Sequence, residues 1–113
     1  MFLTTRTVRT DRYAVVAAKG ELDTATADDL RAAIRAAGPG SVVLDLRDLQ
    51  FCDSAGLSVF VETHNRLGTT GHRLTIACPN EQVARILAVT GLNQVIETVD
   101  ALPDSLPDQP ATR

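Results

Sequence analysis

The stretch Phe51-Cys-Asp-Ser-Ala-Gly-Leu57 decides the fold, because it marks the point where a buried strand gives way to a helix. The preceding segment, Ser41-Val-Val-Leu-Asp-Leu46, is a nearly continuous apolar run, which is typical of a strand covered on both faces of a parallel sheet. A helix is predicted from Ser54 to a stop near Gly68. Its apolar stripe is predicted to consist of Leu57, Phe60, Val61 and His64. Asp53 or Ser54 then caps the helix, whose partially positive end would also tolerate a phosphate.

Further strands alternate with helices along the rest of the chain. Strands are predicted at Leu3 to Arg9, Tyr13 to Ala18, His72 to Cys78 and Val95 to Val99. Helices are predicted from about Thr24 to Ala37 and from Pro79-Asn80 to a cap at Gly91. The first two strands are close enough to form a hairpin. This alternation predicts an α/β domain in which helices pack on a sheet and parallel strands are joined by right-handed crossovers.

Composition and charge limit the possible functions. The 113 residues are the size of one domain, and 44% hydrophobic residues can form a single core. The net charge of −3 and the small number of aromatic residues argue against nucleic acid as a partner. No signal peptide and no run of 18 apolar residues is present, so we expect a cytoplasmic protein without a membrane partner. The segment 100–113 contains three prolines, and we expect it to be a flexible tail.

Cysteine and histidine residues give no pattern of a metal site. Cys52 and Cys78 have neither C-x-x-C nor zinc-like spacing, and we interpret both as small buried hydrophobic residues. A redox role is the alternative, because both lie at or just beyond the ends of predicted strands. We expect His64 to be packed and His72 to be solvated, since no cluster of acidic or thiol groups completes a ligand set. The sequence therefore predicts no metal and no cofactor.

Several motifs together resemble the STAS domain of bacterial anti-sigma factor antagonists. They are Gly20-Glu-Leu-Asp23, Leu44-Asp-Leu46 with Leu49 and Phe51, Asp53-Ser-Ala-Gly-Leu57, and Gly91-Leu92. Neither G-E-L-D nor D-S-x-G-L is specific alone, but their order, each after a predicted strand, is a strong signal. The resemblance spans about residues 12 to 99 and implies a single STAS-like domain over 1–99. Its fold would be a mixed sheet of about four to five strands with helices packed on one side.

The resemblance also implies a function. Antagonists of this family bind a serine kinase that would otherwise hold a sigma factor inactive, and so release the sigma factor for transcription. Phosphorylation of the serine in the second motif ends the binding, and here that serine is Ser54. Asp53 matches the acidic residue before it, and Asp23 matches the acidic residue of the first motif, which lies near the site.

The same resemblance names the contact residues and the partners. Gly56 and Leu57 match the start of the contact helix, and Ala55 stands where many members have a second Ser or Thr. Ala55 therefore removes an alternative phosphate acceptor. The implied partners are an anti-sigma factor serine kinase, which would bring ATP and Mg²⁺, and a phosphoserine phosphatase. The chain itself would be no enzyme.

Phosphorylation would make an acidic corner more acidic. It adds about −1.5 to −2 charges beside Asp53 and Asp23, which would weaken docking without unfolding the domain. We expect Arg31 and Arg35 to lie on the solvent face or far end of the first helix, away from this corner.

Three other classes of protein were weighed. A receiver domain would use Asp45 as its phosphate acceptor, but its acidic pair and its Lys are missing. An enzyme is disfavoured because no phosphate-binding loop, no nucleophile elbow and no His placed to activate Ser54 is present. The main alternative is a STAS scaffold subunit of a transport or stress-sensing complex, which would bind its partners without phosphate on Ser54.

Overall fold

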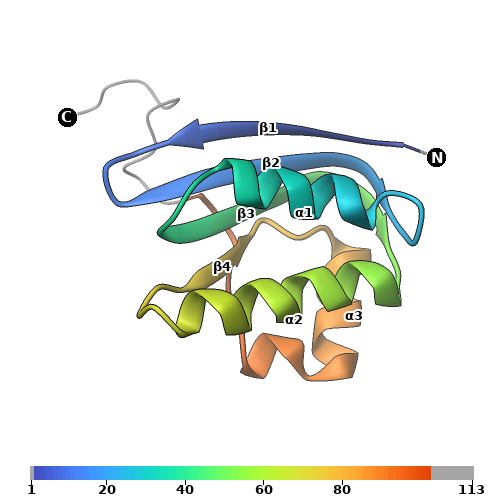
Figure 1. The fold of residues 1–113 in the computed structure, drawn as a ribbon. Coiled ribbons are helices and arrows are strands. Elements are labelled where there is room, and N and C mark those ends of the chain that lie inside the picture. Colours follow the sequence, from blue (N-terminus) through green and yellow to red (C-terminus); the bar gives the residue numbers. More distant parts are fainter. Residues whose placement is uncertain (1, 103–113) are drawn as a thin grey trace.

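The computed structural model describes residues 2–102, within which five strands form one sheet in the order β1-β2-β3-β4-β5 (Figure 1). The strands are β1 (Leu3–Arg9), β2 (Tyr13–Leu22), β3 (Ser41–Cys52), β4 (Leu74–Ala77) and β5 (Glu97–Val99). The helices are α1 (Ala27–Ala36), α2 (Ser54–Gly68), α3 (Glu81–Thr90) and the short 3₁₀ helix η1 (Leu92–Gln94). β1 and β2 pair as an antiparallel hairpin, and the other pairs are parallel, so the sheet is mixed.

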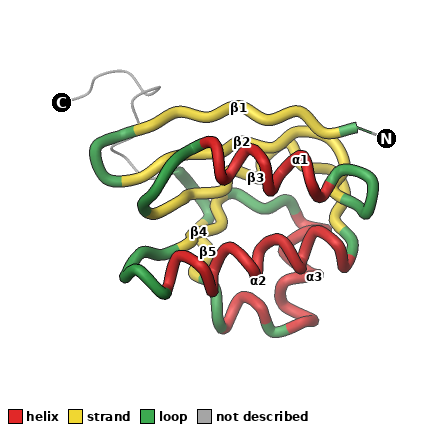
Figure 2. The backbone as a smooth tube through the Cα atoms, viewed as in Figure 1, coloured by secondary structure: helices red, strands yellow, loops and turns green. Residues whose placement is uncertain are grey.

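The helices cover one face of the sheet, as Figure 2 shows for α1 and α2. Buried side chains from α1, α2 and α3 join those of the central strands in one core cluster, which includes Leu30, Phe60, Val83, Leu44 and Leu22. The opposite face, called here the open face, carries a much smaller cluster around Val15, Val43 and Ala77. The predicted mixed sheet with helices on one side is therefore confirmed.

Most predicted elements are present, but several boundaries differ. β3 continues past Leu46 to Cys52, and its register with β2 shifts twice, between Ala17 and Lys19 and between Gly20 and Glu21. These β-bulges absorb extra residues and turn polar side chains outward, so the apolar pattern breaks while the strand continues. α1 begins at Ala27 instead of Thr24, because a tight turn precedes it. η1 was not predicted.

The buried face of α2 is shifted by about one residue from the predicted apolar stripe, so that prediction is wrong in detail. The buried residues are Gly56, Val59, Phe60, Thr63 and Leu67, whereas Leu57, Val61 and His64 are only partly buried. Two local features explain the difference. Gly56 packs directly on Leu22 and Cys52, and Thr63 can be buried because its hydroxyl donates to the Val59 carbonyl at 2.8 Å.

The C-terminal prediction can be followed only to Leu102. Leu102 is partly buried and packs against the open-face cluster. The rest of the predicted tail, 103–113, lies outside the described residues. Among the helices of residues 2–102, none combines the length and the apolar character needed to cross a membrane.

Candidate functional site

The site is built where β2 and β3 end side by side. Leu22 and Cys52 are paired residues at the ends of these parallel strands, and the Asp53 amide donates to the Leu22 carbonyl at 3.1 Å. Asp23 and Asp53 therefore leave adjacent parallel strand ends at the same edge of the sheet, close together as the family resemblance implies.

Asp53 caps α2 through its side chain. Its backbone is extended, and its Oδ1 accepts from the Ala55 amide at 2.9 Å and from the Gly56 amide at 3.4 Å. The sequence left the cap open between Asp53 and Ser54, and the structure assigns it to Asp53. Ser54 is the first residue of α2 and is exposed. Its hydroxyl makes no hydrogen bond to any residue in the range 2–102; only its carbonyl is used, as the acceptor for Ser58 Oγ at 3.0 Å.

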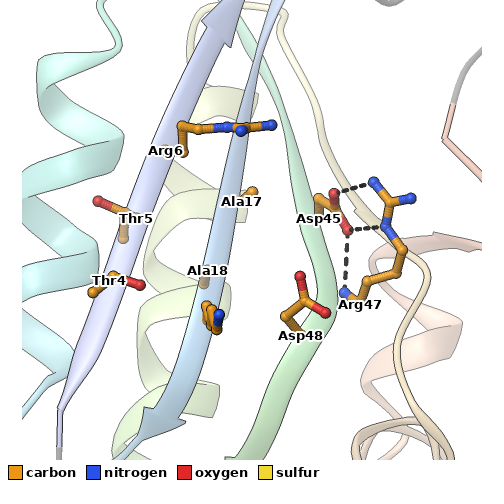
Figure 3. Close-up of a pocket in the computed structure, with 9 residues that line it drawn as sticks. Thr4, Thr5, Arg6, Ala17, Ala18, Asp45, Arg47 and Asp48 are labelled. Atoms are coloured by element: carbon orange, nitrogen blue, oxygen red, sulfur yellow. Dashed lines mark hydrogen bonds and ion pairs between the residues drawn. The ribbon is translucent and has the colours of Figure 1, made fainter. Parts of the chain in front are cut away.

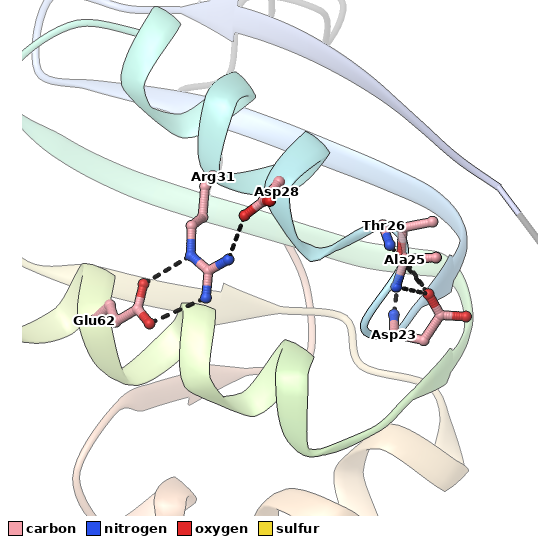
Figure 4. A network of polar contacts seen from close by, with 6 residues as sticks. All are labelled: Asp23, Ala25, Thr26, Asp28, Arg31 and Glu62. Carbon is pink, nitrogen blue, oxygen red and sulfur yellow. Dashed lines mark hydrogen bonds and ion pairs between the residues drawn. The ribbon is translucent and has the colours of Figure 1, made fainter.

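Asp23 organises the turn that precedes α1 (Figure 4). Its Oδ1 accepts from the Ala25 amide at 2.9 Å and from the Thr26 amide at 3.1 Å. The Thr26 hydroxyl is buried in this turn, where it donates to the Glu21 carbonyl at 2.7 Å and accepts from the Asp23 amide at 3.0 Å. The side chains of Asp23 and Thr26 thus hold this turn together through hydrogen bonds to each other's backbone and to Glu21, beside the start of α2.

Gly56 allows α2 to start this close to the sheet. A Cβ added at Gly56 would lie 2.7 Å from Cys52 Sγ and 2.7 Å from the Leu22 side chain, distances that real Cβ atoms essentially never show. Ala55 and Leu57 are partly buried at the edge of the core. The structure therefore brings all six predicted site residues together: two acidic turns and the first turn of α2.

Comparison with known proteins shows which family the chain belongs to. A family model of the STAS domain matches residues 4–105. The chain belongs to the STAS domain family. The anti-sigma F factor antagonist of Paenibacillus polymyxa is 32% identical to it over 90 residues, which cover 76% of this chain and 77% of that one. A protein from Thermotoga neapolitana, named as a homolog of an anti-sigma factor antagonist, is 29% identical to this chain over 69 residues, which cover 61% of each chain.

A solved structure extends the likeness to three dimensions. The crystal structure of an anti-sigma factor antagonist from Mycobacterium paratuberculosis superposes with a TM-score of 0.79 at 29% identity, covering 88% of this chain and 87% of that one. The resemblance inferred from the motifs is thus confirmed, and this STAS domain is a relative of bacterial anti-sigma factor antagonists. The division of the chain at residue 99 stays a prediction.

An ion-pair bridge between α1 and α2 was missed by the sequence analysis. Arg31 Nε lies 2.8 Å from Glu62 Oε1, and Arg31 Nη1 lies 2.6 Å from Asp28 Oδ1 (Figure 4). The hydrogen bond with Glu62 raises the pKa of Arg31, and the same bond lowers the pKa of Glu62. Arg31 therefore lies at the surface between α1 and α2, partly exposed and engaged in this bridge, whereas Arg35 is exposed. No local spacing signals the bridge, because Arg31 and Glu62 are far apart in sequence.

The two cysteines of this STAS domain have different surroundings. Cys52 is buried beneath the start of α2, and burial raises the pKa of its thiol to about 12. At neutral pH this thiol is protonated, which makes it a poor nucleophile and supports its interpretation as a small core residue. Cys78 is only partly buried and packs at the open-face cluster, so its predicted full burial is wrong. Burial also raises the pKa of Cys78.

Asp45, the acceptor that a receiver domain would use, lies away from the ends of β2 and β3 where the candidate site is located. It is buried on the open face, where its Oδ2 lies 2.8 Å from Arg47 Nη2 and its Oδ1 accepts from the Arg47 amide at 3.1 Å (Figure 3). The hydrogen bond with Asp45 raises the pKa of Arg47. Among the described residues, no cluster of three or more His, Cys, Asp or Glu side chains forms a metal site.

Proposed function

We propose that this STAS domain is an anti-sigma factor antagonist that binds an anti-sigma factor serine kinase and thereby releases a sigma factor. In this proposal, phosphorylation of Ser54 ends the binding. The observation that carries it is the exposed Ser54 hydroxyl, which makes no hydrogen bond to any described residue, at the start of a helix already capped by Asp53. The relatives named as anti-sigma factor antagonists support the choice of partner.

Ser54 can accept a phosphate without loss of the fold. Because Asp53 already accepts from the first free amides of α2, no capping bond depends on the serine hydroxyl. The kinase would supply ATP, Mg²⁺ and the catalytic base, so Ser54 needs no activating residue in its own chain. A doubly charged group is also tolerated locally at a helix N-terminus. The modified domain should therefore stay folded.

The phosphate acts on docking through charge and volume. It adds about −1.5 to −2 charges next to Asp53, at an edge of the sheet where Asp23 is also located. A partner surface that fits the unmodified serine and its acidic neighbours would then meet extra charge and three more oxygens. A loss of about 3 kcal/mol would weaken binding by about a hundredfold or more.

The outer face of α2 offers apolar contact area beside Ser54. A groove of about 310 Å³ is lined by Leu57, Ser58, Val61 and Glu62. Leu57 and Val61 belong to the stripe that the sequence predicts as buried, and the fold leaves both partly exposed. An apolar groove beside polar and charged groups is the usual composition of a protein interface. We assign this groove to the kinase, with Ser54 at its rim.

Phosphate mapping tests the proposal. The kinase is first identified by pull-down with the unmodified chain and by expression of each small ATP-binding serine kinase of the same genome. With this kinase and ATP–Mg²⁺, we expect one phosphate, on Ser54, as read by mass spectrometry of the peptides. The matched control is Ser58→Ala, which removes the neighbouring exposed hydroxyl and should still receive one phosphate, on Ser54.

Two Ser54 variants separate the switch from the fold. Ser54→Ala should bind the kinase and escape phosphorylation, while Ser54→Asp should fold normally and bind more weakly. A phosphate on another residue with Ser54 unmodified would contradict the assignment. Tight binding to partners that never modify Ser54 would instead support the scaffold alternative.

A further inference from the structure

Large exposed hydrophobic residues of the described chain fall into two groups. Phe2 and Phe51 are 67% and 37% exposed, and Val89 and Val95 are 80% and 59% exposed. The two valines belong to α3 and to the segment before β5, at the opposite edge of the sheet from β1. Phe2 directly precedes β1 and Phe51 lies near the end of β3, both at the edge of the sheet that borders the site.

Strand register aligns the two phenylalanines on the open face. Glu21 pairs with Phe51, and the Glu21 amide donates to the Phe2 carbonyl at 3.2 Å, which continues the pairing of Leu3 with Gly20. Leu3, Leu22 and Cys52, the neighbours of these residues, point into the helix-covered core. Because side chains alternate along a strand, Phe2, Glu21 and Phe51 form one row across β1, β2 and β3 on the open face.

The position of Phe2 depends on Gly20, which lies beside it on β2. Gly20 has φ +116°, a conformation that side chains rarely adopt, and a Cβ there would overlap the Phe2 carbonyl oxygen. Only glycine therefore lets the chain before β1 approach β2 and make the bond to the Glu21 amide. An exposed phenylalanine is thus fixed by a specific backbone feature of the Gly20-Glu-Leu-Asp23 motif.

A polar row separates the two exposed phenylalanines from the apolar cluster around Val15, Val43 and Ala77 farther along the open face. The next row on the open face consists of Thr4, Lys19 and Asp48, which are polar or charged and line a shallow cleft (Figure 3). A solvated sheet face would show such polar residues throughout. The two phenylalanine rings therefore form an exposed apolar patch at the edge of the sheet where Asp53 and Ser54 follow β3.

We propose that the row Phe2, Glu21 and Phe51 is part of the docking surface for the anti-sigma factor kinase, so that the kinase contacts both α2 and the open face. This inference rests on the proposed function. Ser54 follows Phe51 by three residues, so their Cα atoms are at most about 11 Å apart. A standard interface buries about 800 Å² on each partner, which is wide enough to include both.

The chemistry of the row defines what the kinase must present. Phenylalanine side chains bury large apolar area, and aromatic anchors near the centre of an interface contribute most of the binding energy. Glu21 lies between the two phenylalanines in this row, and Asp23 and Asp53 come directly after β2 and β3. The complementary surface is therefore an apolar pocket with Lys or Arg at its rim.

Serine variants at matched exposed positions test this surface. With the kinase identified as above, we expect Phe51→Ser and Phe2→Ser each to raise Kd at least about tenfold. Val89→Ser and Val95→Ser, which remove comparable exposed apolar groups elsewhere, should stay within about twofold. Gly20→Ala should weaken binding as well, because it displaces Phe2. Thermal unfolding of every variant shows whether the fold is retained, and the tag is placed at the C-terminus so that the segment before Phe2 is unchanged.

Amide hydrogen exchange of the unaltered chain gives a readout that no folding defect can affect. Kinase binding should increase protection in the peptides that contain Phe2 and Glu21 as well as in α2. If the phenylalanine variants bind as the wild type does, or if protection increases in α2 alone, the kinase does not contact the row Phe2, Glu21 and Phe51. The proposed function would then still stand. If the wild-type chain binds no anti-sigma factor kinase, both are wrong.

Discussion

The turns that follow β2 and β3 begin with the same residue type, yet they use their hydroxyl groups in opposite ways. In the first turn, Asp23 and Thr26 bond to each other's backbone, and the Thr26 hydroxyl is buried and fully occupied. In the second, Asp53 alone caps α2, and the hydroxyl of Ser54 is exposed without a partner among the described residues. In both turns the aspartate Oδ1 accepts from the amides two and three residues later, so the difference lies in the hydroxyl: that of Thr26 is buried and bonded within its turn, and that of Ser54 is exposed.

This difference separates a structural hydroxyl from one that is available for modification. A phosphate on Thr26 would break the bonds that hold its turn, and a kinase could reach the oxygen only after local unfolding. A phosphate on Ser54 breaks no hydrogen bond of the described chain. The local residue pattern does not rank the two hydroxyls, because both follow an aspartate at the end of a strand and both precede or open a helix; the resemblance to a family singled out Ser54.

The largest expected effect is at the contact that sets the start of α2. Gly56→Ala would place a Cβ against Cys52 and Leu22, so we expect destabilisation toward the upper end of about 1–3 kcal/mol. The matched control is Gly68→Ala in the same helix, where a Cβ meets nothing within 4 Å and should be neutral or stabilising by up to about 1 kcal/mol. Urea denaturation of both variants measures the change in unfolding free energy. Equal stability of the two would mean that α2 does not rest on the strand ends as closely as described.

The next effect compares the two hydroxyls directly. Thr26→Val keeps the shape but leaves the Asp23 amide without its acceptor, so we expect a loss of about 1–2 kcal/mol in unfolding free energy. Ser54→Ala should change it by less than about 0.5 kcal/mol, as is usual for an exposed position. Denaturation curves of the two variants, recorded side by side, give the result. A comparable loss for Ser54→Ala would show that the serine is a cap and would remove the distinction between the turns.

Sequence reasoning correctly predicted local features, such as helix caps, where a residue type strongly favours one structural role. Asn80 caps α3, and Gly91 ends it in the left-handed conformation with φ 78°, both as expected from their positions. The buried run after Ser41 and the hairpin of β1 and β2 were also predicted correctly. In each case neighbouring residues along the chain carry the information.

Features that depend on residues distant in sequence were missed. The buried face of α2 is set by Gly56 against Leu22, a contact that helical spacing cannot reveal, so the predicted stripe was displaced. Phe51 was recognised only as part of a motif, because its exposure follows from a bulge between β2 and β3. The bridge from Arg31 to Glu62 likewise exists only once α1 and α2 lie side by side.

The smallest expected effect concerns this bridge, which joins the two helices whose starts differ. Hydrogen bonding to Arg31 lowers the pKa of Glu62 in the folded state, so the pair stabilises the fold above the unfolded pKa of Glu, about 4.3, and loses this contribution as pH falls through the lower folded value. Glu62→Gln should therefore lower the melting temperature slightly at pH 7, and the difference from wild type should shrink in acid. The effect is small because both side chains are partly exposed, and salt should reduce it further. Arg35→Gln, which removes an exposed charge of the same helix and leaves the bridge intact, is the control. A difference between Glu62→Gln and wild type that stays constant from pH 7 to pH 3 would show that the bridge does not couple α1 to α2 through charge.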